Sequence, residues 1–142
     1  MSINLKNRKA FRDYVFLEEL ECGIVLTGSE VKAIRGGKVD FLGSYVKIVG
    51  GELYLINLHI GVGGLADSRR TRKLLMNKRE IITIGVKLKQ QKLTLIPVKL
   101  YNKDRLFKLK VALARSKKSQ EKRAQLKARD IERDIERELK EM

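Results

Sequence analysis

Residues 44–60 have the sequence SYVKIVGGELYLINLHI, in which apolar and polar side chains alternate on both sides of Gly50 and Gly51. Alternation with a period of two is typical of a half-buried β-strand, and a pair of glycines reaches positive φ without strain. Two such runs joined by a two-residue turn form a β-hairpin. The stretch therefore predicts a hairpin and favours an antiparallel sheet.

Two further regions predict strands. Residues 14–26 (YVFLEELECGIVL) indicate one long, half-buried strand. Its apolar face is expected to carry Tyr14, Phe16, Leu20, Cys22 and Ile24. Residues 93–101 and 106–114 predict a second long hairpin around a turn at residues 102–104, and Pro97 places its own strand near a sheet edge or a bulge.

Three helices are expected to accompany these strands. In TGSEVKAIRGG, Thr27 stands three residues before Glu30 and two glycines end the segment, which predicts a capping box and a glycine stop on a short helix. Ser68 is expected to cap a second helix that includes residues 74–76, and Asn77 a third. Because the strands come as hairpins, without βαβ repeats, a parallel sheet is disfavoured. We expect a mainly β fold, an OB-like antiparallel β-barrel with about three helices.

The last part of the chain differs from the rest in composition. From Ser116 onward the sequence contains neither glycine nor proline and consists mainly of charged residues, glutamine and alanine. On a helix, its apolar residues would form one narrow stripe: Ala124, Ala128, Ile131, Ile135, Leu139 and Met142. Such a stripe is too narrow to hold a free helix in water, so we expect a tail that is largely disordered alone and helical in a groove. The domains expected are a barrel at residues 1–116 and a tail at residues 117–142.

The chain of 142 residues carries 32 Lys and Arg against 17 Asp and Glu, a formal net charge of +15. Self-repulsion of this size destabilises a compact domain unless a polyanion offsets it. Nucleic acid is the leading expectation for that polyanion, and an anionic membrane surface is the alternative. The sequence has no apolar run of the ~20 residues that cross a bilayer and no apolar stretch near its amino end, so we expect a cytoplasmic protein.

Few residues are suited to catalysis or to metal binding. One Cys, Cys22, and one His, His59, are too few for a disulfide or a structural zinc site. A single His more often packs or faces solvent than it catalyses, and a lone Cys in an apolar strand behaves as a small buried hydrophobe. Glu19 and Glu21 are expected to share a surface while Glu18 points elsewhere, and Glu21 is placed to accept a hydrogen bond from a base amino group. We expect no enzymatic activity, no metal and no cofactor.

The densest basic cluster lies between residues 69 and 79. It consists of Arg69, Arg70, Arg72, Lys73, Lys78 and Arg79. At a loop-to-helix junction, these side chains and the free backbone N–H groups of the helix start would meet phosphates together. A solvated charged face is the alternative. The neighbouring apolar residues 74–76 favour the first interpretation, because they must be partly exposed or tightly packed.

Two other basic groups are expected on the folded domain. One precedes the first long strand and consists of Lys6, Arg8, Lys9 and Arg12. Within it, Asn7 is a candidate to read a base edge, and Phe11 either stacks on a base, as in recognition of single-stranded RNA, or plugs the barrel. The other group lies on the polar face of the last hairpin and consists of Lys99, Lys103, Arg105, Lys108 and Lys110.

Long segments of the sequence resemble a known family. They are NRKAFRDY (7–14), ECGIVLTGSEVKAIRGGKVDF (21–41), GELYLINLHI (51–60), DSRRTRKLLMNKREI (67–81) and LTLIPVKLYNKDRLFKLKVALARSKKSQEKR (93–123). These segments closely resemble the small protein B (SmpB) family, the tmRNA-binding (SsrA-binding) proteins of bacterial trans-translation. The resemblance covers nearly the whole chain.

The resemblance implies a fold and a role. It implies an OB-like barrel with three helices that binds the tRNA-like domain of tmRNA, stands in for the missing anticodon arm and catalyses no reaction. It also implies ribosome rescue on mRNA without a stop codon, with the tail in the empty mRNA channel. The implied partners are tmRNA, the decoding region of 16S rRNA in the 30S ribosomal subunit, and elongation factor Tu. We expect a monomer without a membrane partner, and the alternative function is that of a ribosomal or ribosome-assembly protein that binds rRNA.

Matching the family's motifs residue by residue gives two candidate sets. The residues expected to contact tmRNA are Asn7, Arg8, Lys9, Glu21, Arg69, Arg70, Arg72, Lys73, Leu75 and Lys108. The residues expected to contact the ribosome near the decoding centre are Arg12, Lys117, Lys118, Glu121, Lys122 and Arg123, of which the last three match the family's Asp-Lys-Arg at the base of the tail. The chain departs from the family at Arg12, where His is common, at Ser116, where Gly is common, and in the shorter loop 61–68 (GVGGLADS).

Overall fold

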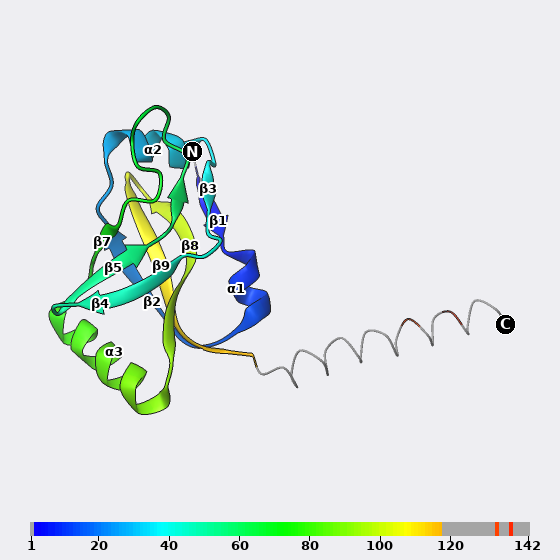
Figure 1. The fold of residues 1–142 in the computed structure, drawn as a ribbon, viewed down its shortest axis with the longest axis vertical. Coiled ribbons are helices and arrows are strands. Elements are labelled where there is room, and N and C mark those ends of the chain that lie inside the picture. Colours follow the sequence, from blue (N-terminus) through cyan, green and yellow to red (C-terminus); the bar gives the residue numbers. More distant parts are fainter. Residues whose placement is uncertain (1, 118–132, 134–136, 138–142) are drawn as a thin grey trace.

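The computed structural model describes residues 2–117, 133 and 137, and the described elements are three long strands, six shorter ones and three helices (Figure 1). The strands are β1 (Asn4–Lys6), β2 (Tyr14–Ile24), β3 (Val39–Asp40), β4 (Tyr45–Val49), β5 (Glu52–Ile56), β6 (His59–Ile60), β7 (Arg72–Leu75), β8 (Thr94–Lys103) and β9 (Leu106–Ser116). The helices are α1 (Arg8–Asp13), α2 (Gly28–Arg35) and α3 (Lys78–Gln91).

The strands form an antiparallel ring. Seven of them make one sheet in the order β1-β8-β4-β5-β7-β2-β9, and an additional pairing of β8 with β9 closes the sheet on itself. Strands β3 and β6 pair separately. The ring is uneven, because the described pairing of β4 with β8 is the single pair Val46 and Leu95. The prediction of a mainly β, OB-like antiparallel barrel is confirmed, with one weak seam.

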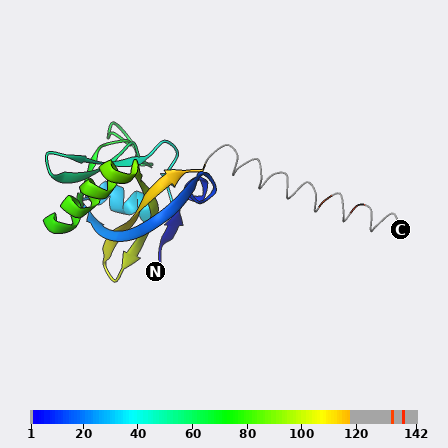
Figure 2. The same ribbon diagram turned by 90° about the horizontal axis from the view of Figure 1, so that it is seen from below.

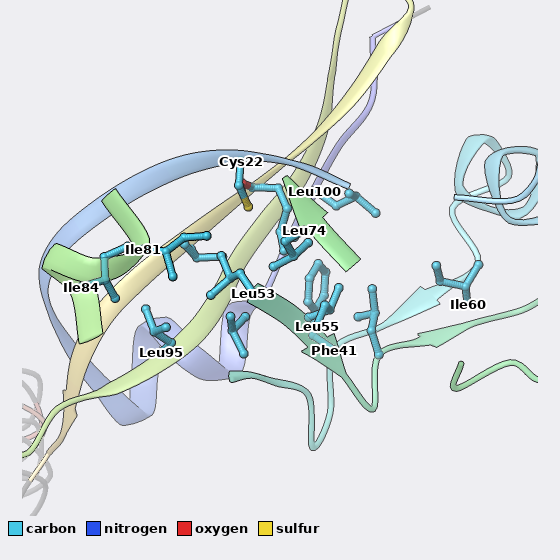
Figure 3. Packing of buried hydrophobic residues seen from close by; sticks show 14 of the residues in the cluster. Cys22, Phe41, Leu53, Leu55, Ile60, Leu74, Ile81, Ile84, Leu95 and Leu100 are labelled. Atoms are coloured by element: carbon cyan, nitrogen blue, oxygen red, sulfur yellow. The ribbon is translucent and has the colours of Figure 1, made fainter. Parts of the chain in front are cut away.

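Apolar side chains fill the ring, and a helix covers each end. Figure 3 shows Leu53, Leu55, Leu74 and Leu100 meeting inside the ring, all with 1% or less of their surface exposed. Ala33 and Ile34 of α2 close one end of this core, and Ile81 and Ile84 of α3 close the other (Figure 1). A second, smaller cluster lies under α1 and consists of Ala10, Ile96, Val98, Ala112 and Ala114.

Strand β2 carries a bulge that changes which face its side chains occupy. The register with β9 shifts between Phe16 and Glu18, so Leu17 is an extra residue. Tyr14 and Phe16 consequently pack on the small cluster under α1, whereas Leu20 and Ile24 pack on the main core. The prediction of one continuous apolar face from Tyr14 to Ile24 is therefore wrong, because one inserted residue reverses a period of two.

Both predicted hairpins are present. Gly50 and Gly51 have φ of 59° and 77°, and the closing pair is Val49 and Glu52, as expected for a two-residue turn that needs positive φ. In the second hairpin Lys103 pairs with Leu106, so the turn lies at residues 104–105, slightly beyond the predicted one.

The helices are partly as predicted. Thr27 and Glu30 form the expected capping box of α2, with the Thr27 N–H donating to Glu30 Oε1 (2.9 Å) and the Glu30 N–H donating to Thr27 Oγ1 (3.2 Å). Asn77 caps α3 as expected. The helix predicted after Ser68 is wrong: the segment forms strand β7, paired with both β5 and β2. Helix α1 brings the number of described helices to three, and it was not predicted from the sequence.

Asn7 joins α1 to the edge of β8. It caps α1, with Oδ1 accepting from the Ala10 N–H (3.3 Å). Its Nδ2 donates to the Pro97 carbonyl (2.8 Å), and its backbone N–H donates to the Val98 carbonyl (2.8 Å). These bonds lie where the β8–β9 register shifts, between Pro97 and Lys99, which confirms the bulge predicted from proline.

The described chain leaves the barrel beside α1. The Lys117 N–H donates to the Asp13 carbonyl (2.9 Å), and Figure 2 shows α1 next to the end of β9. The predicted conformation of the tail, and its boundary, concern residues outside those that the structure describes. Among the described residues no helix is long and apolar enough to cross a membrane.

Candidate nucleic-acid interface

Two rows of outward-facing residues cross the barrel, the first from β7 to β1 and the second from β2 to β1. The cross-strand pairs of the first row link Leu75, Gly23, Lys108, Tyr101 and Asn4 in that order. Those of the second row link Glu21, Lys110, Lys99 and Lys6. We call these residues, together with Lys103, the lysine face. Lys108, Lys110, Lys99 and Lys103 share it as the alternation of the last hairpin predicted.

One end of the lysine face is apolar and flat. Leu75 keeps 54% of its surface exposed although it lies within a strand. Its neighbour across the strands is Gly23, and a Cβ built there would lie 3.2 Å from the Leu75 Cβ. Leu75 therefore packs against the bare backbone of β2, and no side chain of residue 23 covers it.

Glu21 is an ionised acid among cations. It accepts a hydrogen bond from the hydroxyl of Tyr101, and Lys103 Nζ lies 3.8 Å from its Oε1. The hydrogen bond from Tyr101 lowers the pKa of Glu21 most, and the charges of Lys103, Lys108 and Lys110 lower it further, against a smaller opposing effect of burial. The carboxylate consequently remains a hydrogen-bond acceptor at neutral pH.

The basic cluster at residues 69–79 is divided by the structure. Arg72 is fully buried (0% exposed): its Nε donates to Glu30 Oε2 (2.5 Å), Nη1 to the Leu58 carbonyl and Nη2 to the Ser68 carbonyl (3.1 Å). This placement leaves no part of the Arg72 side chain at the surface, where the sequence predicted a contact with RNA. In strand β7 successive side chains point to opposite faces, which directs Arg72 inward and Lys73 outward.

The other members of that cluster lie nearer the surface. Arg70 Nη2 donates to Glu30 Oε1 (2.5 Å), whereas Arg69 is exposed with Nη1 on the Asn57 carbonyl (3.3 Å). Lys73 is exposed, 3.7 Å from Glu52. Lys78 and Arg79 are exposed at the start of α3. The expected loop-to-helix junction is a loop-to-strand junction, and the cluster does not form one phosphate site.

The buried carboxylate of Glu30 is held in its charged form. Burial alone would raise the pKa of Glu30, but hydrogen bonds from Arg70, from the Thr27 N–H and from Arg72 together bring it below its ordinary value. Two arginines and one carboxylate therefore form a structural network between α2 and β7.

The amino-terminal group is also divided. Asn7, predicted to read a base edge, is buried (8% exposed), and both ends of its amide are engaged by Ala10 and Pro97. Arg8 and Lys9 are exposed on α1. Phe11 does not plug the barrel: it meets Phe16 edge to face with ring centroids 5.0 Å apart and is 46% exposed.

Part of the set expected at the ribosome lies around α1. Arg12 is exposed there, and the backbone of Lys117 is bonded to Asp13, which brings these two cations to the same end of the barrel. Lys118, Glu121, Lys122 and Arg123 lie outside the described residues.

The remaining candidates for chemistry are structural. Cys22 is buried, its thiol donates to the Leu109 carbonyl (3.3 Å), and burial raises the pKa of the thiol to about 12. His59 is half-buried in β6. Glu18 points away from Glu21, as predicted, and pairs with Lys87 of α3 (2.7 Å). Within the described part of the chain no group of three or more His, Cys, Asp or Glu could hold a metal ion.

Sequence reasoning missed Tyr101 as part of the candidate interface. The signal was present, because Tyr101 stands between Lys99 and Lys103 at the same parity of an alternating strand. Its hydrogen bond to Glu21 could not be found in this way, since the two residues are eighty positions apart.

Comparisons with known proteins agree on one family. The family model described as "SmpB protein" matches residues 4–141. An SsrA-binding protein of Desulfitobacterium hafniense (strain DSM 10664 / DCB-2) is 45% identical over 140 residues, which cover 95% of this chain and 90% of that protein. One of Roseiflexus sp. (strain RS-1) is 45% identical over 141 residues, which cover 95% and 89%.

A solved structure is similar as well. It is described as "tmRNA-SmpB: a journey to the center of the bacterial ribosome", and its matching chain is 47% identical with a TM-score of 0.68. The match covers 82% of this chain and 85% of that chain.

Replacing the buried arginine tests the network between α2 and β7. Arg72→Ala leaves the Glu30 carboxylate buried with Arg70 as its remaining arginine, so we expect the free energy of unfolding to fall by about 3 kcal/mol. Urea unfolding followed by circular dichroism measures this change. Arg69→Ala, which removes an exposed arginine three positions away, is the control and should change the free energy of unfolding by less than about 0.5 kcal/mol. Equal stability of the two variants would contradict the assignment.

Acid unfolding tests the charge of Glu30. Because folding lowers the pKa of Glu30, its charge contributes stability above the pKa of the unfolded chain, and this contribution is lost as pH falls through the lower folded pKa. The free energy of unfolding should therefore drop more steeply in the wild type than in Glu30→Gln as pH falls below the ordinary carboxyl pKa of 4.5. Urea titrations at several pH values measure both slopes. Glu52→Gln serves as the control and should keep the wild-type slope; a wild-type slope in Glu30→Gln would refute the explanation.

Proposed function

Because this chain belongs to the SmpB family, we propose that it binds the tRNA-like domain of tmRNA and delivers it to stalled ribosomes for trans-translation. The SsrA-binding relatives, which match nearly the whole chain, are the main support for the RNA partner. The solved tmRNA-SmpB structure supports the ribosome as the place of action.

The lysine face is the proposed tmRNA surface. Of the motif positions carried over from the family, Glu21, Leu75 and Lys108 lie on its two rows, and Gly23 joins Leu75 to Lys108. Lysines attract the RNA backbone and release its counterions, whereas Leu75 and the flat backbone of Gly23 offer apolar contact to a sugar or a base. A ligand with closely spaced phosphates and exposed bases satisfies both parts of the surface. Lysines beside an exposed apolar residue are thus the structural observation that supports RNA as the ligand of this face.

The proposed contacts differ from those predicted from the sequence. Asn7 and Arg72 are assigned to the scaffold, because their side chains are occupied inside the protein. The proposed tmRNA contacts that remain are Arg8, Lys9, Glu21, Arg69, Arg70, Lys73, Leu75 and Lys108. Arg70 contributes less than the others, since one of its amino groups is bound to Glu30.

The proposed role is binding without catalysis. The buried thiol of Cys22, with its raised pKa, is unsuited to nucleophilic attack, and this supports a role as an adaptor. We further propose that the protein acts in the cytoplasm, as a monomer, together with elongation factor Tu.

We assign ribosome contact to the tail, residues 117–142, together with Arg12 of α1, and tmRNA binding to the rest of residues 1–116. The backbone bond between Lys117 and Asp13 supports this division, because it starts the tail on the α1 side of the barrel, beside Arg12. The proposed contacts near the decoding centre are Arg12, Lys117, Lys118, Glu121, Lys122 and Arg123. The cations among them suit the phosphates of rRNA.

A competition experiment tests the proposed RNA partner. At physiological salt, the protein should bind the tRNA-like domain of tmRNA in preference to an rRNA fragment of equal length in a gel-shift assay, because specific contacts outlast unspecific phosphate binding. Lys108→Ala should weaken binding and reduce the slope of log affinity against log salt by about 1. Lys89→Ala, on the exposed side of α3, is the matched control. A preference for the rRNA fragment would instead support a ribosomal or ribosome-assembly protein.

Truncation after Lys117 tests the division of roles. This variant keeps the hydrogen bond between Lys117 and Asp13, so the free energy of unfolding of its barrel should equal that of the full chain. Its affinity for the tRNA-like domain should also be unchanged. Tagging of nascent peptides on stalled ribosomes should be lost, because the proposed decoding-centre contacts beyond Lys117 are removed. Gel shifts and a reconstituted tagging assay measure the two activities. Loss of RNA binding, or tagging by the truncated protein, would count against the division.

A further inference from the structure

Tyr101 occupies a central position on the lysine face, although neither motif nor charge pattern assigns it a function. It lies in β8, and Glu21 lies in β2, with β9 between these strands. In the register Tyr101 faces Lys108, and Glu21 faces Lys110, both on β9. Since the Tyr101 hydroxyl donates to Glu21, the phenol ring must extend across β9.

The ring is held at both ends. Its Cβ is fixed by the backbone of β8, and its hydroxyl is bound by a carboxylate that stays ionised, because the hydrogen bond itself and the nearby lysines lower the pKa of Glu21. Burial and the bond to Glu21 raise the pKa of Tyr101, so the phenol remains a neutral donor. An aromatic side chain fixed in this way loses little further rotamer entropy when a ligand packs against it.

The surroundings of the ring carry an excess of positive charge, because the lysine face holds Lys6, Lys99, Lys103, Lys108 and Lys110 against the single carboxylate of Glu21. Lys99 Nζ lies over one face of the Tyr101 ring, 5.1 Å from its centre, as a cation–π contact. Across the strands Lys110 faces Lys99, and Lys99 faces Lys6. Like charges directly opposite each other destabilise a sheet. A row of three lysines beside a fixed aromatic ring is therefore arranged for an anionic ligand.

We propose that Tyr101 is a stacking platform for an unpaired base of the bound RNA, and that Glu21 is a positioning residue that holds its ring across β9. The base packs on the phenol while phosphates on either side of it meet Lys99, Lys108 and Lys110. Stacking on an aromatic ring and phosphate contact with lysines are the usual elements of single-stranded RNA recognition. The inference rests on the proposed RNA-binding function and gives Glu21 a different role from that of a base-contacting acid.

A double-mutant cycle separates the two roles of Glu21. Tyr101→Leu should weaken binding of the tRNA-like domain about tenfold, through the loss of stacking. Glu21→Gln should also weaken it, because a neutral amide oxygen accepts the Tyr101 hydrogen bond less strongly than the carboxylate does. Removal of the negative charge by itself would instead strengthen binding to RNA. In the Tyr101→Leu background, Glu21→Gln should have no effect or should strengthen binding. Equal weakening in both backgrounds would mean that Glu21 contacts RNA directly and would overturn the positioning role.

Further variants identify the part of Tyr101 that matters. Tyr101→Phe keeps the ring and removes the hydroxyl, so it abolishes the hydrogen bond to Glu21 and should weaken binding at least as much as Glu21→Gln does. Tyr54→Leu is the matched control, because Tyr54 is a half-buried strand tyrosine whose cross-strand neighbours are also lysines, Lys47 and Lys73. It should bind RNA as the wild type does. Urea unfolding of each variant checks that the fold is kept: a free energy of unfolding close to that of the wild type excludes unfolding as the cause of weaker RNA binding.

A direct measurement of stacking uses 2-aminopurine placed at unpaired positions of the tRNA-like domain. Binding of the wild type should quench the fluorescence at one position, and Tyr101→Leu should not. If Tyr101→Leu binds and quenches as the wild type does, the stacking platform is refuted while the proposed function stands. If the wild type shows no preference for the tRNA-like domain, the proposed function fails, and with it this inference.

Discussion

The buried pair of Glu30 and Arg72 is the interaction on which the rest of the structure depends. It ties the first turn of α2 to the inner side of β7, and Arg72 also binds the carbonyls of Leu58 and Ser68. Removing these charges from water costs several kcal/mol per ion, which the additional hydrogen bonds, including that from Arg70, offset. This end of the barrel is therefore fixed by a polar network with defined directions, whereas the α3 end is closed by apolar packing.

The same strand links this network to the candidate interface. In β7 the side chains of Arg72 and Leu74 point inward, and those of Lys73 and Leu75 point outward. Anchoring Arg72 thus fixes the register and the facing of Leu75, which lies against Gly23 at the edge of the lysine face. Adjacent residues of one basic cluster consequently have opposite roles, one in the scaffold and one at the surface.

Sequence patterns predicted the hairpins, the capping box at Thr27 and the outward lysines of β8 and β9, because each depends on local periodicity or a local hydrogen bond. Strand β7 was mistaken for a helix, since three consecutive apolar residues fit either period and only its pairing with β5 and β2 decides between them. The roles of Asn7 and Arg72 were equally hidden. Their partners, Pro97 and Glu30, are distant in sequence, and a residue type alone does not distinguish a buried donor from one offered to RNA.

The uneven ring makes the amino-terminal residues more important than their number suggests. The edge of β8 that faces away from β9 is paired with β4 only at Leu95, and it is otherwise covered by Asn7 and β1. A sheet edge left bare presents unused N–H and C=O groups to other molecules. Shortening the amino terminus past Asn7 would thus expose unpaired backbone groups of β8, to which a second copy of the chain could add a strand. The short amino-terminal segment therefore protects the protein from aggregation.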